Sequence, residues 1–395
     1  MNSHLYEDKY HSFDCLLAVD AIQIFSPEKN IFSELDKFYS NCNDWTFGHL
    51  NYDLKNEIEN LHAAVKTNKI GFPDIFLFQP AVVIAINKNA IEISCFDKNA
   101  NEIFESIKQV RLNSNAVSKL NKKINSAITK DDYVKAIEEL KKHLLRGDCY
   151  EINFCQEFFI EDADINPLEI YSCLHKISPS PFSCYYKLND KYLLCASPER
   201  FLAKHQQAIF SQPIKGTAAR SDNEALDLLQ KNNLYSSAKE KSENVMIVDL
   251  VRNDLSRICE NGSVAANELF GIYSFPQVHQ MISTVSGILK DKVSFSDIIK
   301  ATFPMGSMTG APKHRVMQLI DQYEKINRGL FSGSVGYITP QKNFDFNVII
   351  RSIFYNQTNK YLNYFAGSAI TIYADAESEY EECRLKAAAI ENILT

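Results

Sequence analysis

The chain has 395 residues, of which 45% are hydrophobic and 23% are charged. This is enough to bury one large core or about two to three ordinary ones. Its formal net charge of −7 argues against a nucleic-acid-binding surface, since such surfaces are basic. No apolar run reaches the length of a membrane span, and residues 1–9 lack the apolar stretch of a signal peptide. We therefore expect a cytoplasmic protein with neither a membrane nor a nucleic-acid partner.

The ten cysteines are scattered along the chain, and no two of them form a Cys-x-x-Cys pair. Cys155, Cys184 and Cys195 have mainly apolar neighbours, as buried structural cysteines do. The sequence therefore predicts reduced thiols in a reducing compartment, and neither a disulfide framework nor a zinc site.

The first part of the chain, residues 1–120, alternates short apolar runs with clusters of Asn, Lys and Asp. This pattern indicates strands mixed with short helices. The stretch 111–130 is polar and rich in Asn, Ser and Lys, which is typical of a linker. We therefore predict an N-terminal region over residues 1–120 and a second domain over residues 125–395.

The second part begins with a predicted helix over 131–146, which Gly147 ends. Residues 150–160 follow as a strand, with one face made of Tyr150, Ile152, Phe154, Gln156 and Phe158. Gln156 is the polar exception on that face, and it is either a hydrogen-bonded core residue or a residue that faces a buried site. Further strands are predicted at 191–196, 333–339, 344–355 and 361–373, and further helices at 238–251, 312–326 and 377–394. Because strands and helices mix without a strict βαβ alternation, the fold class is α+β.

Lys215 lies between Pro213 and Gly216, so backbone geometry, more than regular secondary structure, is expected to place it. A lysine held in this way can lose its hydration shell and attack carbon. Glu199 follows a Ser-Pro break and precedes Lys215 by one hairpin length. It is the candidate general acid, although the sequence alone leaves open whether the two side chains meet.

Two pairs of glutamates recur at helical spacing: Glu240 with Glu243, and Glu379 with Glu382. Residues three apart share a helix face, so each pair places like charges together. Such carboxylates, facing one another from two helices, suit Mg²⁺; a pair on a solvated helix face is the ordinary alternative. Lys386 lies on the stripe of Glu379 and could reach a carboxylate of the substrate.

Three further segments have features that could serve either the fold or the binding of a ligand. The glycine-rich stretch 306–313 feeds a helix start, which is either a simple tight turn or a carboxylate-binding site. Arg351 shares a predicted strand face with Ile349 and Ile353, so it needs an anion partner, which is either structural or a substrate. The small residues around Gly367 leave room for a ligand to touch backbone.

Together these segments resemble the chorismate-utilising enzymes. The similar stretches occur in family order, and they are Ser197–Arg200, Pro213–Thr217, Glu243–Asp254, Gly306–Lys313, Gly333–Tyr337 and Glu379–Lys386, with weaker similarity at Gly48–Leu54. The resemblance implies two β-sheets packed face to face and flanked by helices. It also implies that residues 125–395 bind chorismate and that residues 1–120 are a shortened version of the family's N-terminal region.

Within the family, two positions favour the aminodeoxychorismate synthase component I branch, a transferase of para-aminobenzoate and folate biosynthesis. A lysine at Lys215 resembles that branch, whereas anthranilate synthase usually has alanine. Glutamine at Gln156 resembles the ammonia-using members, whereas members that add water have a lysine base there. Anthranilate synthase component I remains the alternative. A pyridoxal phosphate enzyme with Lys215 as its Schiff-base lysine and a catalytically silent subunit are more distant ones.

The resemblance also implies roles for individual residues. Lys215 would attack carbon 2 of chorismate while Glu199 assists departure of the carbon 4 hydroxyl. Mg²⁺ would be held by Glu243 and Glu382, with Glu240 and Glu379 near it. Substrate contacts are expected from Thr217, Gln156, Tyr337, Arg351, Gly367, Ser368 and Lys386. Ammonia would come from a separate glutamine amidotransferase subunit. Gln280 stands where the family often has histidine, and the neighbouring His279 receives no role.

Overall fold

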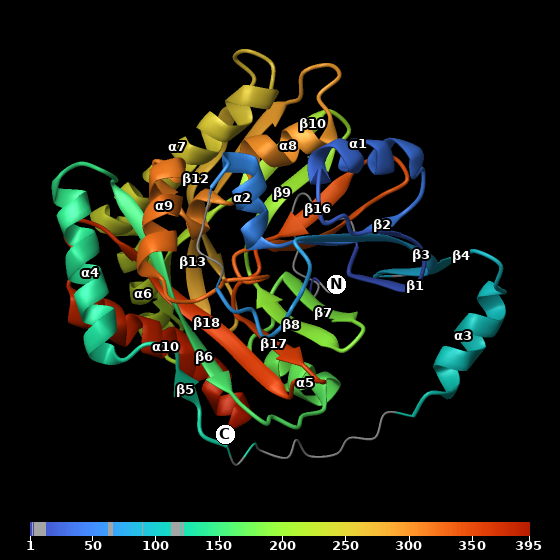
Figure 1. Ribbon diagram of the computed structural model, residues 1–395, viewed down its shortest axis with the longest axis horizontal. Helices are drawn as coiled ribbons and strands as arrows, with labels where there is room; N and C mark the ends of the chain where they lie inside the picture. Colours follow the sequence, from blue (N-terminus) through green and yellow to red (C-terminus); the bar gives the residue numbers. More distant parts are fainter. Residues whose placement is uncertain (2, 4–12, 62–65, 89, 112–119, 121) are drawn as a thin grey trace.

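The computed structural model describes residues 1, 3, 13–61, 66–88, 90–111, 120 and 122–395, and in these ranges the chain forms two antiparallel sheets (Figure 1). The larger sheet has the strand order β1 (Cys15–Phe25), β3 (Ile75–Asn87), β2 (Thr46–Leu50), β15 (Ser334–Ile338), β16 (Phe344–Asn347), β9 (Arg200–His205), β10 (Ala208–Gln212), β13 (Val278–Ile288) and β11 (Ile214–Ala219). Two more strands join it, β4 (Ala90–Cys95) beside β3 and β12 (Ala265–Ser274) beside β13.

The smaller sheet has the order β14 (Gly310–Ala311), β6 (Glu151–Ile160), β18 (Tyr361–Ile370), β17 (Ser352–Asn356), β8 (Lys191–Ser197) and β7 (Phe182–Leu188), with β5 (Asn125–Ser126) beside β6. The α-helices are α1 (Ile31–Asn41), α2 (Lys55–Glu59), α3 (Ala100–Gln109), α4 (Lys130–Leu145), α5 (Pro167–Ile177), α6 (Glu224–Ser236), α7 (Ala238–Ile258), α8 (Phe295–Thr302), α9 (Lys313–Tyr323) and α10 (Ala376–Leu394). Short 3-10 helices occupy Tyr52–Leu54 and Gly306–Met308.

Both faces of the smaller sheet are buried, each in a different core. Leu193 and Phe354 pack into the core shared with the larger sheet, whereas their neighbours Leu194 and Ile353 pack into a second core. This follows from strand geometry, since successive side chains point to opposite faces. Helices α4, α5, α9 and α10 complete the second core, and α1, α7 and α8 pack with the first. The predicted α+β class and the two facing sheets with flanking helices are confirmed.

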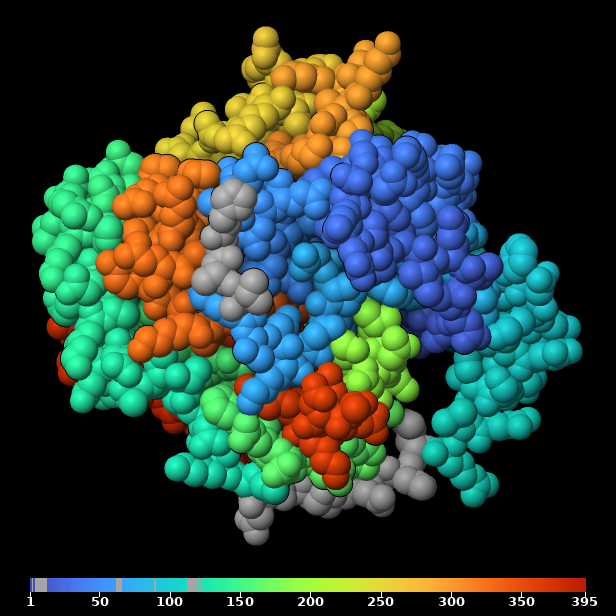
Figure 2. All heavy atoms as spheres, in the orientation of Figure 1, coloured from blue at the N-terminus to red at the C-terminus, as the bar shows by residue number. Residues whose placement is uncertain are grey.

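The two predicted parts of the chain contribute strands to one sheet, because β2 pairs with β15 over Thr46–Leu50 and Ser334–Ile338. The domain boundary near residue 120 therefore stays a prediction, and part of the predicted linker lies outside the described residues. Helix α3 projects from the body and buries none of its residues (Figure 2). Every helix within the described ranges is too short or too polar to traverse a lipid bilayer.

Several predicted elements differ from those observed. The strand predicted over 344–355 is two strands, β16 and β17, which belong to different sheets. The chain crosses between the sheets at residues 348–351, where Arg351 adopts a left-handed φ of 50°, so the predicted strand face of Arg351 is wrong. Lys215 lies on a strand, β11, and not in a loop. Helix α7 runs on to Ile258, beyond the predicted end at residue 251.

Candidate active site

Lys215 stands where β11 bulges away from its neighbour β13. The strands pair at Ile214 with Ile282 and at Thr217 with Gln280, and the register shifts between these two pairs. Gly216 has a φ of 94°, and a Cβ there would lie 3.0 Å from the Glu240 carboxylate. The glycine therefore lets the bulge approach helix α7 closely, and it leaves Lys215 only 9% exposed.

The amine of Lys215 is ion-paired to a residue that the sequence prediction missed. Lys215 Nζ lies 2.5 Å from Glu151 Oε1, and Glu151 is 1% exposed at the start of β6. Gly310 of β14 pairs with the next residue of β6, and a Cβ on Gly310 would come within 2.0 Å of the Glu151 carbonyl oxygen. The signal for Glu151 was present in the strand alternation, because it shares a face with polar Asn153 and Glu157.

Several carboxylates act on the Lys215 amine. Burial by itself lowers the pKa of Lys215, but the hydrogen-bonded Glu151 and the nearby charges of Glu243 and Glu199 raise it above the ordinary lysine value. The lysine is therefore an ammonium in the substrate-free site. An ammonium has no free electron pair, so the predicted role of Lys215 as a nucleophile requires that it first lose a proton.

Glu199 lies between β8 and β9, directly before Arg200. The sequence left open whether it meets Lys215, and the structure brings it close enough for the lysine charge to act on it. The Glu199 side chain is buried, and burial raises its pKa to about 7. A hydrogen bond from Ser307 and the positive charges of Lys215 and Arg351 act in the opposite direction and lower the pKa, but burial is the larger effect. Its backbone is fixed as well, since Glu199 N donates to Ser197 Oγ at 3.2 Å and its carbonyl accepts from Val348 N at 3.0 Å. A carboxyl that titrates near neutral pH is suited to protonate a leaving group.

The four glutamates predicted as metal ligands lie on the first two turns of α7 and α10. Ser237 caps α7 by accepting from Glu240 N, and Asp375 caps α10 by accepting from Ser378 N. Lys239 of α7 connects the two groups: its Nζ is 3.9 Å from Glu243 Oε1, and its charge lowers the pKa of both Glu379 and Glu382. The carboxylates therefore face one another from two helices.

The electrostatics of these carboxylates suit a cation. Burial raises the pKa of Glu243 to about 7. The positive charge of Lys215 lowers this pKa, whereas the negative charges of Glu151 and Glu240 raise it further. Burial also raises the pKa of Glu379, partly offset by a hydrogen bond from Ser368. Within the described part of the chain, no three His, Cys, Asp or Glu side chains are close enough to hold one ion together. The predicted four-glutamate group is therefore not assembled in the described residues, and Mg²⁺ binding stays a prediction that rests on the oxygen donors, because Mg²⁺ is commonly bound through one or two carboxylates and keeps several waters.

The predicted small-residue and lysine contacts are brought to this carboxylate group. Lys386 Nζ lies 2.7 Å from Glu382 Oε1 and donates to the Gly367 carbonyl at 3.0 Å. Burial would raise the pKa of Glu382, but Lys386 holds it below its ordinary value. Ser368 is buried and shares a 3.1 Å hydrogen bond with Tyr133. Residues 367–368 of β18 therefore form the floor beneath α10.

Arg351 also lies near Glu199, and the charges of the two side chains act on one another. Burial lowers the pKa of its guanidinium, and the charge of Glu199 opposes that shift. In the described ranges the Arg351 side chain has no hydrogen bond or ion pair of its own, and it borders a hollow formed with Pro198, Phe275 and Ser180. An unbonded, partly buried arginine is suited to bind a carboxylate ligand.

Three predicted substrate contacts are not brought to Lys215. Gln156 lies on the opposite face of β6 from Glu151, where it accepts from Ser126 at 2.9 Å and donates to the Cys383 sulfur at 3.3 Å. Tyr337 packs against the rings of Phe13, Trp45 and Phe47. Thr217 is exposed to solvent on β11. Alternation along a strand explains Gln156, because positions five apart point to opposite faces.

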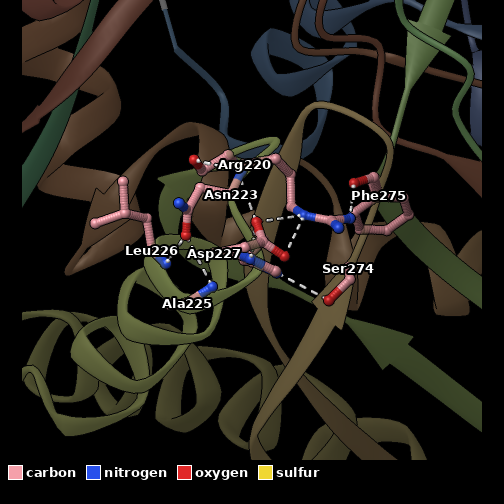
Figure 3. Close-up of polar contacts among 9 residues, drawn as sticks. Arg220, Asn223, Ala225, Leu226, Asp227, Ser274 and Phe275 are labelled. Atoms are coloured by element: carbon pink, nitrogen blue, oxygen red, sulfur yellow. Dashed lines mark hydrogen bonds and ion pairs between the residues drawn. The ribbon is translucent and has the colours of Figure 1, made fainter.

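A polar network anchors the far end of β11, and Figure 3 shows Arg220, Asp227 and Ser274 within it. Arg220 Nε donates to Asp227 Oδ1 at 2.7 Å, and its Nη1 donates to the Phe275 carbonyl at 3.0 Å. His279 bridges Asp227, at 3.1 Å, and Ser274, at 2.8 Å. The Arg220 hydrogen bond is the largest cause that lowers the pKa of Asp227 to about 2. This network ties α6 to β12 and β13 and so fixes the strand that carries Lys215.

Comparison with known proteins agrees with this geometry. The chorismate binding enzyme family matches residues 6–392. Aminodeoxychorismate synthase component 1 of Salmonella typhimurium is 32% identical over 337 residues, which cover 85% of this chain and 73% of that protein. A probable chloroplastic aminodeoxychorismate synthase of rice is 38% identical over 264 residues, so the match covers 66% of this chain but only 29% of the rice protein.

Solved structures show the same fold. Anthranilate synthase component I of Streptococcus pneumoniae superposes with a TM-score of 0.83 at 23% identity, covering 98% of this chain and 94% of that one. The menaquinone-specific isochorismate synthase of Escherichia coli gives a TM-score of 0.75 at 16% identity, covering 96% and 86%. These two structures show which fold the chain has. The family match and the Salmonella relative show which family it belongs to. The chain belongs to the chorismate binding enzyme family.

Proposed function

We propose that this chain is component 1 of an aminodeoxychorismate synthase and converts chorismate and ammonia to 4-amino-4-deoxychorismate. The observation that carries the proposal is the buried Lys215 beside Glu199, a nucleophile and an acid in one site. The names of the curated relatives support the same chemistry. The structural likeness to anthranilate synthase does not favour that activity, since at 23% identity it concerns the fold alone.

The proposed reaction proceeds in two displacements. Lys215 attacks carbon 2 of the ring, the two ring double bonds shift, and the carbon 4 hydroxyl leaves as water with a proton from Glu199. Ammonia then attacks carbon 4, the double bonds shift back, and carbon 2 releases the lysine. Arg351, together with Lys386 beside the Gly367 carbonyl, supplies positive charge for the two carboxylates of chorismate.

Mg²⁺ belongs to the proposal as the cation that Glu243 and Glu382 would hold, with Glu240 and Glu379 close by. When bound, it supplies charge neutralisation and orientation for the ring carboxylate of the substrate. The raised pKa values of Glu243 and Glu379 support a cation there, because a buried carboxylate with too little positive charge around it is costly.

The cellular setting is also proposed. The relatives named component 1 imply a second component, and we assign it the role of a glutamine amidotransferase that supplies ammonia. The product would lead to para-aminobenzoate and folate. All ten cysteines are free thiols, and seven of them are buried, which supports a reducing compartment such as the cytoplasm.

Product identification tests the proposal directly. Purified protein is incubated with chorismate, Mg²⁺ and an ammonium salt, with and without an aminodeoxychorismate lyase. We expect 4-aminobenzoate only when the lyase is present. Anthranilate, isochorismate or salicylate as the main product would overturn the proposed activity.

A variant tests the role of the lysine. Lys215→Ala removes the nucleophile but leaves Arg351 and Lys386 in place, so chorismate still binds while 4-amino-4-deoxychorismate formation is lost. Binding is followed by calorimetry and product formation by the coupled lyase assay. Lys204→Ala, on strand β9 of the same sheet, is the matched control and retains turnover. Unchanged turnover in Lys215→Ala contradicts the covalent route.

A further inference from the structure

Glu151 is the one residue in direct ionic contact with Lys215 in the described part of the chain, and the reaction outlined above gives it no task. Its carboxylate is 1% exposed, with Oε1 2.5 Å from the lysine amine. Its second oxygen, Oε2, is buried and has no hydrogen-bond partner among the described residues. A buried carboxylate oxygen without a partner is costly, so it calls for a functional explanation.

The covalent route creates a need that Glu151 can meet. An ammonium has no lone pair, so Lys215 must transfer one proton before it can attack carbon. Four carboxylates face the lysine: Glu151 from β6, Glu199 from the loop after β8, Glu243 from α7 and Glu382 from α10. Glu199 must enter the step protonated, since it gives its proton to the leaving hydroxyl. Glu243 and Glu382 are the proposed cation ligands and must stay ionised.

We propose that Glu151 is the positioning residue of Lys215: it holds the amine towards the ring and accepts the amine's proton when substrate fills the site. This inference rests on the proposed function, because only a covalent lysine route needs a neutral amine. Substrate entry removes water from the site. With less water, the charged pair of ammonium and carboxylate is favoured less strongly over the neutral pair of amine and carboxylic acid. The proton then moves along the existing hydrogen bond, from Nζ to Oε1.

The atoms and charges of the step balance. Proton transfer gives a neutral Lys215 amine and a neutral Glu151 carboxylic acid. The amine lone pair forms the bond to carbon 2, and the electron pairs of the ring shift to expel the carbon 4 oxygen. That oxygen takes the proton of Glu199 and leaves as water, so Glu199 becomes a carboxylate and Lys215 a secondary ammonium. When ammonia has attacked carbon 4 and the lysine is expelled, Glu151 returns its proton to Lys215. No proton has to cross to solvent to activate the lysine.

The pH dependence of turnover distinguishes this role from a merely structural one. In Glu151→Gln the amide keeps the size of the side chain but cannot accept the proton, so the lysine must release it to solvent. We expect the ratio of kcat in Glu151→Gln to kcat in the wild-type protein to rise about tenfold per pH unit below the lysine pKa of the variant, and then to level off. Taking the ratio at saturating Mg²⁺ and equal total ammonia cancels the ionisation of ammonia itself.

Two further variants complete the test. Glu151→Asp keeps a carboxylate but on a shorter side chain, so its kcat is expected to fall. Because the proton acceptor is still present, the ratio of its kcat to the wild-type kcat stays flat with pH. Glu157→Gln, six residues along the same strand and bonded to Tyr361 and Asn363, is the matched control with a flat ratio and near wild-type kcat. If Glu151→Gln is insoluble, Glu151→Ala replaces it, because it also lacks the acceptor. The chorismate KM is expected to change less than about threefold in each soluble variant.

The outcomes separate the two proposals. A flat ratio in Glu151→Gln, or a ratio in Glu151→Asp that rises like that of Glu151→Gln, overturns the role of Glu151 while product identity leaves the proposed function intact. A wild-type protein that yields anthranilate, or a Lys215→Ala variant with full turnover, overturns the proposed function and this inference with it.

Discussion

Replacing Glu199 by glutamine is expected to remove activity and, above neutral pH, to stabilise the protein. Burial raises the pKa of this carboxyl from 4.5 to about 7. Between these two pH values the folded protein binds one proton more than the unfolded chain, so the free energy of unfolding falls as pH rises through that window. Over the full shift, the loss is about 3 kcal/mol. A glutamine resembles the protonated carboxyl in shape and charge and therefore avoids this loss.

The assay is chemical unfolding of the wild-type protein and Glu199→Gln in EDTA at a series of pH values from 5 to 8.5. We expect similar stability near pH 5 and an advantage for Glu199→Gln that grows to about 3 kcal/mol by pH 8. Glu260→Gln, which changes an exposed carboxylate, is the control and shows no such trend. An advantage that does not change with pH, or one that is larger at pH 5 than at pH 8, would refute the assignment of a buried, neutral carboxyl to Glu199.

Three other predictions concern the same site. With free ammonia held constant, kcat declines above about pH 7 by about tenfold per unit, because Glu199 loses the proton that it must donate; a kcat that stays level to pH 9 argues against Glu199 as the acid. In denaturant titrations, Gly310→Ala is expected to lower the free energy of unfolding by about 1–3 kcal/mol more than Gly147→Ala. Both glycines have a positive φ, but of the two only Gly310 packs against backbone, at Glu151. Equal losses in the two variants would contradict this packing. Removing metal with EDTA stops turnover and Mg²⁺ restores it, while Glu243→Gln needs about tenfold more Mg²⁺ and the exposed Glu105→Gln does not; turnover that survives exhaustive chelation contradicts the carboxylate site.

Long, ordered motifs made much of the site predictable from the sequence. Glu199 and Lys215 were paired by motif and hairpin distance, and the structure brings them together because β9 and β10 return the chain. The two glutamate pairs were predicted from helical spacing, which depends only on local periodicity. Local rules were sufficient for these features because each motif lies within one element or one turn.

The features that the sequence did not place depend on contacts between distant strands. The polarity of Gln156 left two readings open and the family resemblance made it an expected substrate contact, but the other face of β6 meets Lys215, and Glu151, the partner of the lysine on that face, was not predicted. The alternation of residues in one sequence shows that strand β6 has two faces. It does not show which face meets β11, the strand that carries Lys215 some sixty residues later. Residues 344–355 read as one strand because nothing local marks a change of sheet at Arg351.

The pairing of β2 with β15 also affects how the chain is made. Hydrogen bonds join Thr46–Leu50 to Ser334–Ile338, so an early strand must wait for a partner that the ribosome produces almost three hundred residues later. During that interval the hydrophobic strands β1, β2 and β3 have an open edge, which is a site for aggregation. Contacts so distant in sequence also slow folding, since a long loop must close before they form. We therefore expect assembly of the larger sheet to be a late folding event and the N-terminal strands to need protection by chaperones until it occurs.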